Sequence, residues 1–142
     1  MHCVIGGAYA GKRSAVRARY DALVWHSAYN GAVLEDWRDN VVPGTTLVLE
    51  GWEQWLATAL AGSGDDDRLR QRFTETLDAL VLAERERGLR VVLILLEVGR
   101  GIVPIDARDR RLRDLAGWLA QDATARAGRV WYVWNGLVKQ LA

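Results

Sequence analysis

The stretch HCVIGGAYAGKRS, residues 2–14, decides which fold this sequence predicts. Its first four residues form a short apolar run that is typical of a buried strand, and glycines follow at once. Gly6, Gly11 and Lys12 have the spacing of a phosphate-binding loop, G-x-x-x-x-G-K-[ST], but Arg13 stands where that pattern has a hydroxyl residue. Apolar residues at helical spacing come after Lys12. We therefore predict a strand, a phosphate-binding loop and a helix in this order.

The predicted loop suits phosphate because of its backbone and its charge. Its glycines allow consecutive N–H groups to turn towards phosphate oxygens, and the start of the following helix adds positive potential. Lys12 is expected to reach the outer phosphates and to stabilise the charge that develops on them during transfer. A glycine-rich turn that merely begins a helix is the alternative, and the flanking strand and helix favour phosphate binding. The predicted nucleotide-binding residues are Gly6, Gly7, Ala8, Tyr9, Ala10, Gly11, Lys12, Arg13 and Ser14.

Length and composition indicate a single globular domain over residues 1–142. The 19 Lys and Arg residues nearly balance the 18 Asp and Glu residues, so a net charge of +1 gives no electrostatic reason to expect nucleic acid or an anionic membrane as a partner. The single cysteine, Cys3, cannot form an internal disulfide. The longest apolar run, residues 91–96, is too short to span a bilayer. We expect a cytoplasmic protein.

The rest of the chain alternates strand patterns with helix patterns. Further strands are predicted at residues 45–49, 91–98, 130–134 and 137–141, and further helices at residues 52–60, 68–87 and from Asp106 onwards. Asn135 and Gly136 predict a hairpin between the last two strands, while residues 23–26 fit either the end of the first helix or a second strand. This order predicts an α/β three-layer sandwich with a mainly parallel sheet and a C-terminal antiparallel hairpin.

Two carboxylates stand at the ends of predicted strands, Glu50 after TTLVL and Glu97 after LILL. Because ligands of parallel α/β sheets bind at the carboxyl ends of the strands, both are candidates for chemistry beside the loop. Glu50 is the candidate ligand of a magnesium ion that accompanies the nucleotide, directly or through water. With Lys12, these two acids form the predicted catalytic set. A lone acid at a strand end is otherwise a solvated rim residue, and that alternative stays open for each.

The second half of the chain carries the most specific patterns. They are EVGRGIVP at residues 97–104 and R-x-x-R-D-x-x-G, formed by Arg110, Arg113, Asp114 and Gly117. Together with GGAYAGKR, TTLVLEG and the terminal hairpin, they resemble the adenosylcobinamide kinase/adenosylcobinamide-phosphate guanylyltransferase family of cobalamin synthesis. From spacing alone, Arg110 and Asp114 are expected to form a surface ion pair at i,i+4.

This resemblance implies a P-loop domain of RecA-like topology with two activities. The first transfers the γ-phosphate of ATP or GTP, with Mg²⁺, to the aminopropanol hydroxyl of adenosylcobinamide. The second places GMP on that phosphate through a guanylylated histidine. The resemblance also implies a homo-oligomer. The substrate-loop candidates that it suggests are Gly99, Gly101, Arg110 and Arg113.

The sequence departs from the family pattern at two places that bear on function. Arg13 replaces the serine that usually follows the loop lysine, so the site gains a positive charge and loses a metal-binding hydroxyl unless Ser14 takes over. The segment between the loop and residues 45–49 is short and has no Arg-Pro, which leaves His26 as the sole guanylyl-acceptor candidate. We therefore expect kinase activity without the second step. The alternative is a non-catalytic nucleotide-binding or scaffold homologue of the same fold.

Overall fold

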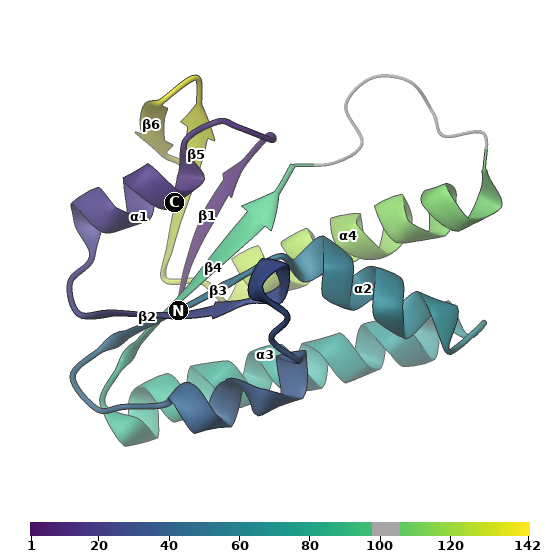
Figure 1. Cartoon of the computed structure of the whole chain (residues 1–142), viewed down its shortest axis with the longest axis horizontal. Coiled ribbons are helices and arrows are strands. Elements are labelled where there is room, and N and C mark those ends of the chain that lie inside the picture. The colour runs from purple at the N-terminus through teal and green to yellow at the C-terminus, as the bar shows by residue number, and fades with distance from the viewer. Residues whose placement is uncertain (98–105) are drawn as a thin grey trace.

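A computed structural model describes residues 1–97 and 106–142 and contains, within these ranges, a six-stranded sheet in the order β2-β3-β4-β1-β5-β6 (Figure 1). Strands β1 to β5 pair in parallel, and β6 runs antiparallel to β5 at the edge. The strands are β1 (His2–Gly6), β2 (Leu23–Ser27), β3 (Thr46–Glu50), β4 (Arg90–Leu96), β5 (Arg129–Trp134) and β6 (Leu137–Gln140). The predicted mainly parallel sheet with its C-terminal hairpin is confirmed.

Helices cover both faces of this sheet, but unequally. Helix α1 lies on one face, whereas α2, α3 and α4 lie on the other (Figure 1). The helices are α1 (Lys12–Arg19), α2 (Trp52–Ala61), α3 (Asp66–Arg87) and α4 (Ala107–Arg126), with short 3₁₀ helices η1 (Ala28–Asn30) and η2 (Leu34–Asn40). None of the helices in the described part of the chain is both long and apolar enough to cross a membrane.

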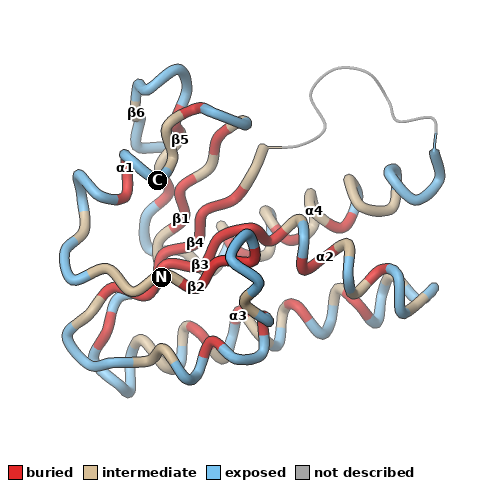
Figure 2. The backbone as a smooth tube through the Cα atoms, viewed as in Figure 1, coloured by how far each residue is buried: buried red, intermediate tan, exposed pale blue. Residues whose placement is uncertain are grey.

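The core consists of two layers because the side chains of a strand point alternately to the two faces. On β4, Leu93 and Leu95 pack with the helices α2 to α4, whereas Val92 and Ile94 pack with Val16 of α1. Figure 2 shows that burial is concentrated in the central strands, and every residue of β3 is buried. Both faces of the central strands are therefore apolar, as the uninterrupted hydrophobic run at residues 91–96 predicts.

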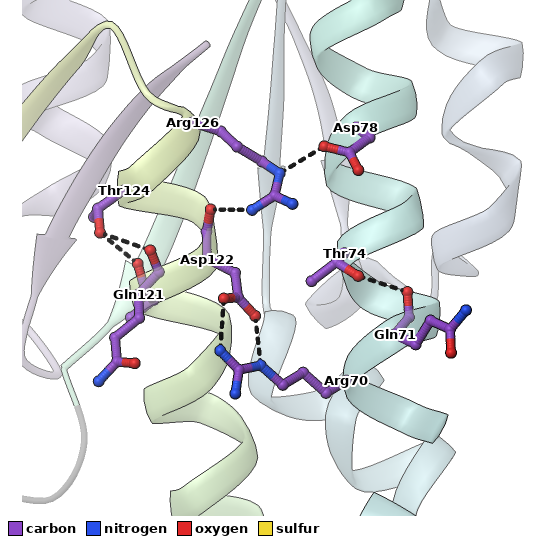
Figure 3. Close-up of polar contacts among 9 residues, drawn as sticks. Arg70, Gln71, Thr74, Asp78, Gln121, Asp122, Thr124 and Arg126 are labelled. Atoms are coloured by element: carbon purple, nitrogen blue, oxygen red, sulfur yellow. Dashed lines mark hydrogen bonds and ion pairs between the residues drawn. The ribbon is translucent and has the colours of Figure 1, made fainter. Parts of the chain in front are cut away.

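Three arginine–carboxylate contacts join α3 to α4, and Figure 3 shows two of them. Arg70 of α3 donates from Nε at 3.0 Å and from Nη2 at 2.9 Å to the two carboxylate oxygens of Asp122. One helical turn further on, Arg126 donates from Nε to Asp78 at 2.6 Å. These side chains lie above the apolar interface of the two helices, so they fix how the helices align rather than forming the core themselves.

Local sequence signals locate most element ends correctly. Asp65 and Asp106 cap α3 and α4 by accepting hydrogen bonds from backbone N–H groups, and Gly88 ends α3 with φ 70°. The hairpin turn has positive φ at Asn135 and Gly136, 48° and 77°, as a type I′ turn requires. Residues 23–27, which the pattern left undecided, form β2.

One expected contact is wrong. Asp114 forms its ion pair with the neighbouring Arg113, at 3.6 Å, and not with Arg110. Arg113 and Asp114 are both partly exposed to solvent. For such side chains, ion pairs with different neighbours differ little in free energy. Spacing by four residues therefore did not determine the partner.

Candidate functional site

The predicted phosphate loop connects β1 to α1 at the carboxyl edge of the sheet. Gly6 ends β1, and a Cβ atom there would lie 2.6 Å from the backbone oxygen of Val133, so only glycine fits beside β5. Gly11 precedes α1 in the left-handed region, with φ 96°, which a side chain would strain. The loop also contacts the hairpin, because Gly136 N donates to Ala10 O at 2.9 Å. The structure therefore requires glycine at both of these positions of the motif.

A cavity of about 660 Å³ opens beside the loop and brings several of the predicted residues together. Among the predicted residues, it is lined by Ala8, Tyr9, Ala10, Gly11, Lys12, Arg13, Ser14 and Glu50. Tyr29, Glu53, Ile94 and Leu96 complete the lining within the described part of the chain. The cavity therefore combines two cationic side chains, two carboxylates and an apolar wall from β4, a composition that suits a phosphorylated ligand with a less polar portion.

Lys12 begins α1 and has its ammonium group at the loop. Its Nζ donates to Gly7 O at 2.5 Å. Partial burial lowers the pKa of Lys12, and the carboxylates of Glu53 and Glu50 act in the opposite direction. In this position the ammonium group bonds to a loop carbonyl, so a phosphate oxygen could replace that carbonyl as its acceptor after a small rotation of the side chain.

Arg13 lies in the first turn of α1 and forms a bidentate ion pair with Glu50 at the end of β3. Arg13 Nε donates to Glu50 Oε2 at 2.9 Å, and Nη2 donates to Oε1. The Glu50 side chain is 3% exposed and the Arg13 side chain 47% exposed. This hydrogen bonding raises the pKa of Arg13. Arg13, which replaces the usual metal-binding hydroxyl residue, therefore contacts Glu50, which was expected to bind the metal.

Magnesium, which the resemblance implies together with the nucleotide, does not fit this arrangement as a protein-held ion. Both oxygens of Glu50 accept hydrogen bonds from Arg13, and a guanidinium has no lone pair with which to bind a cation. Within residues 1–97 and 106–142, no group of three or more His, Cys, Asp or Glu side chains is placed to hold a metal ion. A cation at Glu50 would have to share the carboxylate with the positively charged guanidinium of Arg13 or displace it.

Glu97 is also at the carboxyl edge, but its surroundings differ from those of Glu50. Its backbone N donates to Gly6 O at 2.8 Å, which places it beside the end of β1. Its carboxylate accepts a hydrogen bond of 2.7 Å from the hydroxyl of Tyr132 on β5. Glu97 does not belong to the described lining of the cavity. The structure therefore brings Glu97 close to the loop backbone but does not join its carboxylate to Lys12 and Glu50.

His26 lies in β2 and is 3% exposed. Its Nε2 lies 2.7 Å from Val33 O, and its Nδ1 lies 2.9 Å from Asn40 Nδ2. The ring also lies against Trp55, with centroids 5.7 Å apart. Because a carbonyl can only accept and an amide NH₂ can only donate, these partners fit a neutral ring with hydrogen on Nε2. Both ring nitrogens are therefore engaged in the structure.

The substrate-loop candidates are not at the cavity as far as the structure describes them. Gly99 and Gly101 lie outside the described residues. Arg110 and Arg113 lie in α4, whose buried residues pack on the opposite sheet face from α1. Their part in binding a substrate stays a prediction.

Four residues of the cavity lining were not among the predicted site residues: the polar Tyr29 and Glu53, and the apolar Ile94 and Leu96. The Tyr29 hydroxyl donates to the Glu53 carboxylate across the opening, and burial raises the pKa of Tyr29 above its usual value. Glu53 lies in the first turn of α2, directly after the β3 end that contains Glu50. A carboxylate three residues after a strand-end acid was the available signal. The Asn30-Gly31 turn signal lies beside Tyr29, but the 3₁₀ helix η1 that directs its side chain to the cavity has no sequence pattern of its own.

Comparison with known proteins supplies a second line of evidence. A family model described as cobinamide kinase/cobinamide phosphate guanyltransferase matches residues 24–141. The matched span begins after the phosphate loop, so the argument for the loop rests on its geometry.

Three curated relatives are bifunctional adenosylcobalamin biosynthesis proteins. The one from Escherichia coli is 36% identical over 73 residues, 51% of this chain and 40% of that protein. The one from Salmonella typhimurium is 35% identical over 87 residues, with shares of 58% and 48%. The one from Pseudomonas aeruginosa is 33% identical over 100 residues, with shares of 70% and 55%. The chain spans about half the length of the curated relatives it matches.

Proposed function

The chain belongs to the cobinamide kinase/cobinamide phosphate guanyltransferase family, and from this premise we propose that it is an adenosylcobinamide kinase of cobalamin biosynthesis. In this proposal it transfers the γ-phosphate of ATP or GTP to the aminopropanol hydroxyl of adenosylcobinamide. The observation that carries the proposal is the cavity beside the β1–α1 loop, where Lys12 and Arg13 provide two cations at the carboxyl edge of a parallel sheet. Family membership supports the substrate, and the cavity supports the phosphate donor.

The residues have distinct proposed roles. The loop backbone and Lys12 bind the phosphates of the donor, and Lys12 stabilises the negative charge that develops during in-line transfer. Arg13 adds a second cation at the same cavity. Magnesium enters with ATP or GTP, held by the phosphates and water, since both oxygens of Glu50 are engaged. Glu97 lies close enough to the loop to affect turnover, but which group it serves is not assigned.

The guanylyltransferase activity is not part of this proposal. A histidine that accepts GMP needs an accessible ring nitrogen with a free lone pair. His26 is buried, and both of its ring nitrogens have partners. These observations support a kinase that lacks the second step.

A second candidate function is supported by a specific observation. The ion pair with Arg13 engages the carboxylate that was expected to bind the metal, which fits a nucleotide-binding or scaffold homologue that has lost phosphoryl transfer. Retention of Lys12 at the cavity favours the enzyme. As further parts of the proposal, the protein acts in the cytoplasm as a homo-oligomer, with the corrinoid and the nucleotide as its partners and no nucleic acid.

Transfer of the labelled γ-phosphate from ATP or GTP to cobinamide tests the proposal directly. We expect a phosphorylated corrinoid product with at least one of the two donors. Thermal unfolding in the presence of each donor, cobinamide, and both together separates the two candidates. Nucleotide at about 100 times its Kd should stabilise the fold by roughly 2.7 kcal/mol in either case. Stabilisation by nucleotide without any product supports the scaffold, and absence of both effects contradicts the two proposals together.

A further inference from the structure

The ion pair between Arg13 and Glu50 differs from an ordinary surface contact in how firmly it fixes the arginine. Two adjacent donors of the guanidinium, Nε and Nη2, bind the two oxygens of one carboxylate. The Arg13 Cζ atom also lies 5.8 Å from the ring centroid of Trp25, within the range of a cation–π interaction. One edge of the guanidinium is therefore held by Glu50, and the side chain has less rotamer freedom to lose when a ligand binds.

The ion pair with Glu50 leaves the other edge of the Arg13 guanidinium, at Nη1, available to a ligand. Within the described residues, Nη1 donates no hydrogen bond, although a guanidinium offers five N–H donors in all. The arginine is the exposed partner, at 47%, while the carboxylate behind it is 3% exposed. The pair has no net charge, but its more exposed member is the arginine, so a ligand in the cavity beside Lys12 approaches positive charge.

We propose that Arg13, positioned by Glu50, is a phosphate-binding side chain of this cavity, and that the site binds a nucleoside triphosphate without requiring a divalent cation for affinity. The inference rests on the proposed function, in that it takes the cavity to be the nucleotide site. Glu50 is then a positioning residue, not a metal ligand. The guanidinium supplies, at the place of the usual hydroxyl, part of the positive charge that a bound cation would otherwise bring to the phosphates.

Two physical arguments favour this assignment over a metal bound to Glu50. A cation at Glu50 would either displace two charge-assisted hydrogen bonds, which are about twice as strong as neutral ones, or share the carboxylate with Arg13 at its remaining lone pairs. In both cases it would lie beside the guanidinium, where like charges repel. A phosphate group at the open edge of Arg13 breaks neither bond and adds a new one.

Calorimetric titration of the full chain with ATP and with GTP tests this, in buffer with excess magnesium and in buffer with excess EDTA. We expect the Kd of wild type for the better ligand to differ between the two buffers by less than about fivefold. A larger weakening in EDTA overturns the inference while leaving the proposed function intact. Absence of binding in both buffers overturns the proposed function and the inference with it.

Variants separate the roles of the two residues. Arg13→Ser restores a hydroxyl and releases Glu50, so we expect its Kd in EDTA to rise about tenfold or more and magnesium to restore most of the affinity. Unchanged affinity of this variant in EDTA overturns the inference.

Glu50→Gln should weaken binding by similar factors in both buffers, because it loosens Arg13 in both. Weakening in magnesium alone would instead identify Glu50 as a metal ligand. Arg17→Ser is the matched control, since Arg17 lies on the same helix over the same Trp25 ring, at 5.3 Å, and no hydrogen bond joins it to Glu50 among the described residues. Its Kd values should equal those of wild type.

Discussion

Two bidentate arginine–carboxylate pairs in this molecule have nearly the same bonding and different surroundings. In both, Nε and Nη2 of the arginine donate to the two oxygens of one acid: Arg13 to Glu50, and Arg70 to Asp122. The arginines are comparably exposed, at 47% and 40%, but the acids are not, at 3% and 15%. The first pair lines a cavity at the end of the sheet, and the second joins the outer sides of two helices (Figure 3).

The difference shows that bonding geometry alone does not identify a functional pair. Arg70 lies over the ring of Trp118, at 5.1 Å, much as Arg13 lies over Trp25. What separates the two pairs is the space beside them and the other cation in it, because Lys12 shares the cavity with Arg13. The first pair should therefore affect ligand binding and turnover, and the second should affect only how firmly α3 and α4 are held.

Lys12→Ala should produce the largest effect, a loss of phosphoryl transfer of about a thousandfold. Removing the ammonium leaves the developing charge on the phosphates without its principal donor at the loop. Labelled-phosphate transfer to cobinamide measures the rate, and circular dichroism with thermal unfolding verifies the fold. Turnover near the wild-type rate would mean that the loop is only a turn. The pair of Arg13 and Glu50 would then have no more claim to a functional role than the pair of Arg70 and Asp122.

Glu50→Gln and Asp122→Asn form the direct test of the comparison. Glu50→Gln should lower turnover about tenfold while changing the free energy of unfolding by no more than about 1 kcal/mol, because the arginine that it leaves unpaired is half exposed and remains hydrated. Asp122→Asn should leave turnover unchanged. The measurements are initial rates and urea-induced unfolding on the same preparations. Equal effects of the two variants on turnover would contradict the assignment.

The extent to which the sequence predicts this molecule differs between the fold and the site. Local signals were sufficient for β1, the β3 and β4 runs, the caps Asp65 and Asp106, and the Asn135–Gly136 turn, because each depends on neighbours in sequence. The loop and the acid at the end of β3 were also located, since parallel strands bring their carboxyl ends to one edge.

The contacts within the site were not predictable in the same way. The pairing of Arg13 with Glu50 depends on the spatial order of β1, β4 and β3 and on a rotamer, neither of which has a sequence pattern. The 3₁₀ turns that bring Tyr29 to the cavity and Asn40 to His26 have no hydrophobic period to reveal them. Predictions from single residues therefore identified Lys12, Arg13 and Glu50 but not the contact between Arg13 and Glu50.

Asp122→Asn should have a small effect, and that effect should be on stability alone. An ion pair at the surface of two helices contributes less than about 1 kcal/mol, and the amide keeps one acceptor oxygen for Arg70. We expect a fall in the free energy of unfolding within that limit and a weaker dependence of stability on salt than in wild type. A loss of several kcal/mol would show that this pair contributes more to stability than a surface contact does. Exposure of the pair would then be a poor guide to its contribution.

The last expected effect is the absence of a signal. If function belongs to the groups that face the cavity, then His26 should not become guanylylated, because its ring is buried in β2 with Nε2 against Val33 O and Nδ1 against Asn40. GTP labelled at its α-phosphate should leave no radioactive band on the chain after denaturing electrophoresis under conditions that preserve phosphoramidate bonds. The matched variant is His26→Gln, which should resemble wild type in this assay. A labelled band in wild type that is missing from His26→Gln would mean that β2 opens to expose the ring. The guanylyltransferase activity would then become part of the proposed function. A position in the cavity lining would no longer be enough to decide which residues take part in the reaction.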